Sequence, residues 1–241
     1  AMIGSKYEDP MQSDEQLDVL IVQPNIDPYN KFEAMTQAQQ DEMLLNAAKE
    51  NLEYRRQDTT AAPLLLLAPE TFTRGIETHT IQANSSWKRY TSFLKDYPEV
   101  NMIFGASSYT LIKSSEAPSH TARNAGKGYW TESHNSALIV NGKGNTDMCH
   151  KNKLVVIVEK TPYPALVCPI DDKLGGFIGR CIGQGDASLL NISTSEGKNI
   201  PIGCAVCYES VYGEYYTSYV RQGAKAMTII TNDAWWGDTP G

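Results

Sequence analysis

Three residues of different chemistry each lie at the end of an apolar run or directly after one. Glu70 closes the segment LLLLAPE, Lys151 lies in CHKNKLVV, and Cys207 follows the apolar run in PIGCAVCYES. A carboxylate, an ammonium and a thiol that meet in space can serve as base, oxyanion partner and nucleophile in acyl transfer. Such a site would require three separate strand ends to lie close together.

The thiol of Cys207 would need activation, because an ordinary cysteine is mostly protonated at neutral pH and only the thiolate is strongly nucleophilic. We expect Glu70 to accept the proton. Lys151 is expected to lower the thiol pKa and then to bind the oxyanion, together with the backbone N–H of Tyr208. This chemistry requires neither a cofactor nor a metal.

Each of these residues also has a plain structural interpretation. Glu70 could be a surface charge or a helix cap, Lys151 a solvated turn lysine, and Cys207 a small core residue. Cys204 and Cys207 form a C-x-x-C pair, which could be a thiol–disulfide couple or half of a zinc site. No second pair or histidine cluster stands at ligand spacing, so a metal is not expected.

Composition narrows the class of protein. The 241 residues include 41% hydrophobic and 20% charged residues, which is typical of a globular chain. The net charge of −7 argues against nucleic acid as a partner, since phosphate binding draws on clustered Lys and Arg. No apolar run approaches the roughly 18 residues of a membrane span, and residues 1–20 do not resemble a signal peptide. We expect a polar segment at 1–16 and one domain at 17–241.

Strands and helices are predicted to alternate, which favours a layered α/β fold. Hydrophobic patterning predicts strands at 18–23, 64–67, 101–109, 130–140, 146–150, 200–206 and 225–231, and helices at 31–57, 85–95 and 211–222. Gly105 is expected to allow close approach of another backbone, and residues 141–145 to form a hairpin turn. Residues 111–128 are predicted to be a loop, and 161–196 a long loop or lid.

Several short motifs resemble a known superfamily. Apolar-Pro-Glu at Glu70, Lys-Asn-x-Leu at Lys151 and Cys-Tyr-Glu at Cys207 occur in the order found in the nitrilase superfamily. The segments VQPNI at 22–26 and NDAWWG at 232–237 resemble one branch, the apolipoprotein N-acyltransferases of bacterial membranes. The resemblance extends over residues 17–241.

The resemblance implies further site residues and a fold. The fold would be a nitrilase-like αββα sandwich, which we expect to be incomplete at the C-terminus. Glu159 would be a second carboxylate that keeps Lys151 charged and oriented, although a surface ion pair with Lys160 is the alternative. Glu209 would orient the junction at the nucleophile. Trp235 and Trp236 could contact substrate or could equally be packing residues.

The activity implied by the resemblance is acyl transfer. Cys207 would take a fatty acyl group from a phospholipid as a thioester and pass it to the N-terminal amine of a diacylglyceryl-cysteine lipoprotein. The expected location is the bacterial inner membrane with the catalytic domain on the periplasmic side, anchored by membrane-spanning parts absent from this sequence. The alternatives are a soluble nitrilase-superfamily amidase that hydrolyses a small amide, and a noncatalytic fragment of the same fold.

Overall fold

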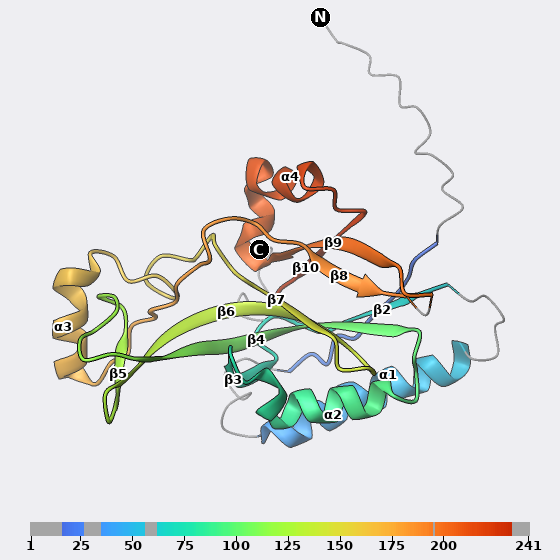
Figure 1. The fold of residues 1–241 in the computed structure, drawn as a ribbon, viewed down its shortest axis with the longest axis horizontal. Helices are drawn as coiled ribbons and strands as arrows, with labels where there is room; N and C mark the ends of the chain where they lie inside the picture. Colours follow the sequence, from blue (N-terminus) through green and yellow to red (C-terminus); the bar gives the residue numbers. More distant parts are fainter. Residues whose placement is uncertain (1–15, 27–34, 56–61, 195, 233–241) are drawn as a thin grey trace, which may run out of the picture.

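The chain folds into four layers, with two sheets stacked between outer helices (Figure 1). The computed structural model describes residues 16–26, 35–55, 62–194 and 196–232. Helices α1 (Gln37–Arg55) and α2 (Ser85–Leu94) cover one face of the larger sheet. The smaller sheet stacks on its other face and carries α4 (Gly213–Arg221) on the outside. The predicted αββα sandwich is confirmed.

The larger sheet combines a parallel part and an antiparallel part. Its strands are β1 (Asp18–Ile21), β2 (Leu64–Leu67), β3 (Thr73–Glu77), β4 (Val100–Lys113), β5 (Arg123–Gly126), β6 (Tyr129–Asn141) and β7 (Thr146–His150). Strands β1, β2 and β4 run parallel, whereas β4, β6 and β7 form antiparallel pairs. The carboxyl ends of β1 and β2 therefore lie at the same edge of the sheet, where ligands of α/β sheets usually bind.

Strand β2 shows why this sheet must be covered on both faces. All four of its leucines are buried, because successive side chains of a strand point to opposite faces. Leu64 and Leu66 pack with α1 and α2, while Leu65 and Leu67 pack against the smaller sheet. The uninterrupted apolar run is thus the signature of a central, doubly covered strand.

The helical layer is tied together by a buried carboxylate. Asp41 of α1 is fully buried and accepts hydrogen bonds from Ser86, Arg89 and Tyr90 of α2. Gln37 donates a fourth. These bonds satisfy a charge that would otherwise be costly to bury, and they fix α1 against α2.

The smaller sheet contains β8 (Leu190–Ser193), β9 (Asn199–Val206) and β10 (Ala226–Ile230). Strands β9 and β10 are parallel, and Ile230 pairs with Val206. Helix α4 packs on β9 through Tyr219, whose hydroxyl donates to the carbonyl of Cys204. A 3-10 turn, η2 (Cys207–Val211), connects β9 to α4.

Two predicted loops contain regular structure, and those predictions were wrong. Within 111–128, β4 continues to Lys113 and β5 forms an extra strand. Within 161–196 lie α3 (Pro164–Leu174) and β8. Pro164 occupies the first turn of α3, where its missing N–H costs nothing, and Gly175 ends the helix with φ of 108°. Strand β3 and the 3-10 turn η1 (Ile81–Ala83) were not predicted at all.

Candidate active site

The three residues singled out by the sequence come from three strand ends. Glu70 follows β2, Lys151 follows β7, and Cys207 follows β9. The first two belong to the larger sheet and the third to the smaller sheet, so the site lies where the two stacked sheets end together. The structure brings all three residues into one cluster.

Lys151 lies between two carboxylates. Its Nζ is 3.1 Å from Glu70 Oε1 and 3.0 Å from Glu159, and only 1% of its surface is exposed. Burial alone would lower the pKa of Lys151, but the charges of Glu70 and Glu159 outweigh burial and raise that pKa above its ordinary value. The ammonium therefore stays protonated. Glu159 is thus an ion-pair partner of Lys151.

The thiol of Cys207 lies close enough to Glu70 and Lys151 to interact with both. Burial raises the pKa of the Cys207 thiol, and the Glu70 carboxylate raises it further. A hydrogen bond with Thr231 and the charge of Lys151 lower it only in part. Lys151 thus lowers the thiol pKa in the expected direction, but burial and Glu70 outweigh it and the pKa is raised overall.

The backbone at Cys207 is left-handed. Its φ is 50°, which is uncommon for a residue with a side chain. The residue lies between β9 and η2, so the predicted strand-to-helix junction is present. Strain of this kind is often held in place at functional sites.

Glu209 supplies hydrogen bonds that hold this junction. The residue is buried, and its carboxylate accepts from the backbone N–H groups of Val206, Asn152 and Lys153. One carboxylate thereby links the end of β9 to the turn that follows Lys151. These bonds hold backbone beside Cys207, and the role of Glu209 in orienting a nucleophile stays a prediction.

Asn135 is a site residue that the sequence analysis missed. It lies on β6, and its Nδ2 donates to Glu70 Oε1 at 2.8 Å and to Glu159 Oε1 at 2.6 Å. The backbone carbonyl of Asn135 accepts a hydrogen bond from the backbone N–H of Lys151. Two carboxylates that share a cation would repel each other without such a donor. The available signal was the polar pair Asn135-Ser136 before an apolar run, which alone indicates no role.

The remaining predicted contacts are less central. The Tyr208 side chain is exposed and packs edge-on against Tyr212. Trp235 and Trp236 lie outside the described residues, as does most of the NDAWWG segment.

Cys204 is fully buried, and burial raises its pKa to about 12. A redox couple with Cys207 is disfavoured, because reactive thiols of such pairs are accessible and have low pKa values.

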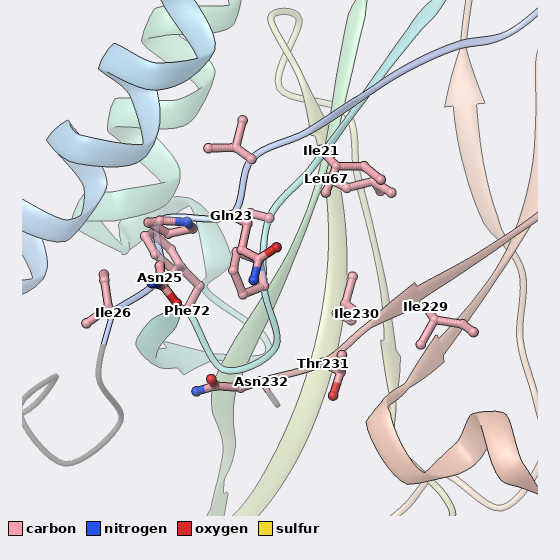
Figure 2. Close-up of a pocket in the computed structure, with 14 residues that line it drawn as sticks. Ile21, Gln23, Asn25, Ile26, Leu67, Phe72, Ile229, Ile230, Thr231 and Asn232 are labelled. Atoms are coloured by element: carbon pink, nitrogen blue, oxygen red, sulfur yellow. The ribbon is translucent and has the colours of Figure 1, made fainter. Parts of the chain in front are cut away.

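A cavity of about 400 Å³ lies at the carboxyl ends of β1, β2 and β10 (Figure 2). Its walls include Leu67 and Pro69 from the end of β2, Ile230 and Thr231 from the end of β10, and Phe72. Since Pro69 precedes Glu70 and Thr231 hydrogen bonds with Cys207, the cavity begins next to Glu70 and Cys207.

The sequence matches one known protein family. The sequence profile of the carbon–nitrogen hydrolase family matches residues 19–241. The chain belongs to the carbon–nitrogen hydrolase family, which agrees with the nitrilase-like fold inferred from the motifs.

Curated relatives carry a narrower name. An apolipoprotein N-acyltransferase of Chlorobaculum tepidum is 22% identical over 233 residues, which cover 92% of this chain and 40% of that protein. One from Geobacter metallireducens is 35% identical over 94 residues, covering 39% of this chain and 16% of that protein. The chain therefore spans less than half the length of these relatives.

Solved structures of the nitrilase superfamily are similar at lower identity. An amidase from Nesterenkonia superposes with a TM-score of 0.46 and 15% identity, covering 81% of this chain and 60% of that one. A superfamily member from Saccharomyces cerevisiae gives a TM-score of 0.48 and 13% identity, covering 81% of this chain and 59% of that one.

Within the described ranges, no helix is both long and apolar enough to cross a bilayer.

Proposed function

We propose that this chain is the catalytic part of an acyltransferase that moves a fatty acyl group from a phospholipid to the N-terminal amine of a diacylglyceryl-cysteine lipoprotein. The observation that carries the chemistry is the cluster in which Lys151 lies between Glu70 and Glu159 while Cys207 contacts Glu70. The lipid and lipoprotein substrates are proposed from the name of the curated relatives.

In the first half-reaction, Glu70 takes the proton of the Cys207 thiol as the sulfur attacks an ester carbonyl of the phospholipid. Lys151 is the cation nearest the developing oxyanion and stabilises it. The tetrahedral intermediate collapses, the C–O bond breaks, and the leaving lysophospholipid oxygen takes the proton back from Glu70. An acyl thioester on Cys207 remains.

In the second half-reaction, the amine of the lipoprotein attacks the thioester and gives a proton to Glu70. The C–S bond breaks, an amide forms, and the Cys207 sulfur recovers a proton. Glu159 and Asn135 do not touch the reacting atoms in this scheme. They keep Lys151 charged and Glu70 in position, which is why their hydrogen bonds matter.

The test is intact-protein mass spectrometry after incubation with phospholipid in mild detergent. We expect a fatty-acyl mass gain that hydroxylamine removes and that Cys207→Ala abolishes. Cys181→Ala is the matched control, because Cys181 is another partly exposed thiol near Lys151 and Glu159.

Two outcomes would contradict the proposal. Hydrolysis of small amides without acyl gain from phospholipid would identify an amidase with the same catalytic residues. If neither substrate class reacts and the alkylation rate of Cys207 is the same in wild-type protein and in Glu70→Gln, the fold would be noncatalytic.

A further inference from the structure

The cavity beside Cys207 has the size of a ligand site. It measures about 400 Å³, within the range of roughly 300–1,000 Å³ typical of small-molecule pockets. Its walls are formed at the carboxyl ends of β1, β2 and β10 (Figure 2). These ends come from both sheets, so the cavity continues the gap between the stacked layers.

The lining of this cavity is mostly apolar and carries no charge, with Gln23, Asn25, Thr231 and Asn232 as its polar members. Ile26, Leu67, Phe72 and Ile230 are among its 14 lining residues, and none of the 14 has an ionisable side chain. A charged ligand would lose its hydration here without gaining a partner. A hydrocarbon chain would instead be removed from water against matching side chains.

The position of Thr231 connects this apolar space to the nucleophile. Thr231 lines the cavity and also hydrogen bonds with the Cys207 thiol. Pro69 also lines the cavity and directly precedes Glu70. A group bound covalently to the Cys207 sulfur therefore has the base on one side and an uncharged cavity next to it.

We propose that this cavity binds the hydrocarbon chain of the acyl group that Cys207 receives and thereby selects its length. The inference rests on the proposed function, because that function is the reason for a chain to be attached to the sulfur. The carbonyl lies at the thiol, and the methylenes extend past Thr231 toward Ile230, Phe72 and Ile26. Chains longer than the cavity protrude and gain nothing further.

The chain site can be tested without acyl transfer, using N-alkyl iodoacetamides from methyl to dodecyl. Cys207 displaces iodide, a C–S bond replaces the C–I bond, and the thiol proton goes to Glu70 or buffer. Because the alkyl chain binds before reaction, we expect the second-order rate at Cys207 to rise roughly fourfold per methylene and then to level off. Peptide mass spectrometry separates this rate from those of the other cysteines.

Gln23 offers a variant that fills the cavity without disturbing the core. Its side chain is exposed and lines the cavity (Figure 2), so Gln23→Trp should remove most of the chain-length dependence of the alkylation rate. Gln23→Ala should retain the dependence. Ser92→Trp is the control, because Ser92 is exposed on α2 across the larger sheet.

Equal rates for methyl and long reagents, or an unchanged length dependence in a folded Gln23→Trp, would overturn the inference. If Gln23→Trp does not fold, a flat series in wild-type protein alone is sufficient to reject the chain site. Failure of the proposed function looks different: the length dependence would persist while phospholipid leaves no acyl group on Cys207.

Discussion

The backbone of β4 at Gly105 determines where Glu70 can lie, and a single methyl group should displace it. A Cβ at position 105 would be 2.5 Å from Glu70 Cα and from Thr71 N, and 2.7 Å from Pro69 O. Ordinary contacts begin near 3.4 Å, so Gly105→Ala must move the Glu70 turn by about 0.9 Å, the difference between 3.4 and 2.5 Å. No side-chain rotation can relieve the overlap, because all three atoms belong to the main chain.

The expected magnitude has two parts. Overpacking of this kind costs about 1–3 kcal/mol of folding free energy, and a displacement near 1 Å of a catalytic group costs roughly 100-fold in rate. Gly142→Ala is the matched control, because Gly142 directly follows β6 at the end of that strand far from Glu70. Its Cβ would be 2.4 Å from the carbonyl oxygen of Leu94, so it should lose similar stability without affecting the site.

Stability is measured by urea unfolding, and chemistry by the burst of p-nitrophenol when a short p-nitrophenyl ester acylates Cys207. We expect both variants to unfold at lower urea and only Gly105→Ala to acylate about 100-fold more slowly. If the two variants lose equal stability and acylate at the wild-type rate, the position of Glu70 does not depend on Gly105. If both lose the burst, the loss reflects general destabilisation.

Three further changes probe other parts of the molecule. Asn135→Asp replaces the donor between Glu70 and Glu159 by a third carboxylate, so the acylation rate of Cys207 at pH 7 should fall by at least tenfold. The rate should recover partly as pH is lowered. The control Asn124→Asp, on exposed β5, should not change the rate. Burial lowers the pKa of His150 to about 4, so stability should fall between pH 6.5 and 4, by roughly 1–2 kcal/mol after allowing for its partial exposure. His150→Gln should remove that component of the pH dependence in urea titrations, whereas exposed His120→Gln should not. Asp41→Asn removes the buried charge that receives the α2 hydrogen bonds and should cost roughly 2–3 kcal/mol in thermal unfolding while leaving the thiol reaction unchanged.

Sequence patterning predicted most elements near the site because the strongest signals occur there. The doubly buried strand before Glu70, the hairpin before Lys151 and the apolar strand before Cys207 all have uninterrupted or alternating apolar runs. Gly105 was predicted to permit a close backbone approach, and the approaching segment is the Glu70 turn itself. Position in the sheet, rather than residue type alone, makes such glycines recognisable.

The missed features depend on contacts that are distant in sequence. Asn135 is recognisable only when Glu70 and Glu159 are known to face it, 65 and 24 residues away. Helix α3 was obscured by Pro169 in its interior, since proline normally breaks a helix. Asp171 of this helix is buried and forms an ion pair with the buried Arg180. This ion pair holds the helix in place. The Pro164 and Gly175 boundary signals were present in the sequence but were outweighed by the surrounding prolines and glycines.

The charge balance of the cluster argues for the order of events at the thiol. Two carboxylates, Glu70 and Glu159, share one ammonium, so the buried site is negative before Cys207 ionises. A resting thiolate would add a second excess negative charge, and burial together with Glu70 accordingly raises the thiol pKa. Cys207 should therefore remain protonated until a carbonyl arrives, and proton transfer to Glu70 should accompany attack instead of preceding it. In the proposed mechanism Lys151 would therefore act mainly on the oxyanion, with Glu70 and Glu159 keeping it charged.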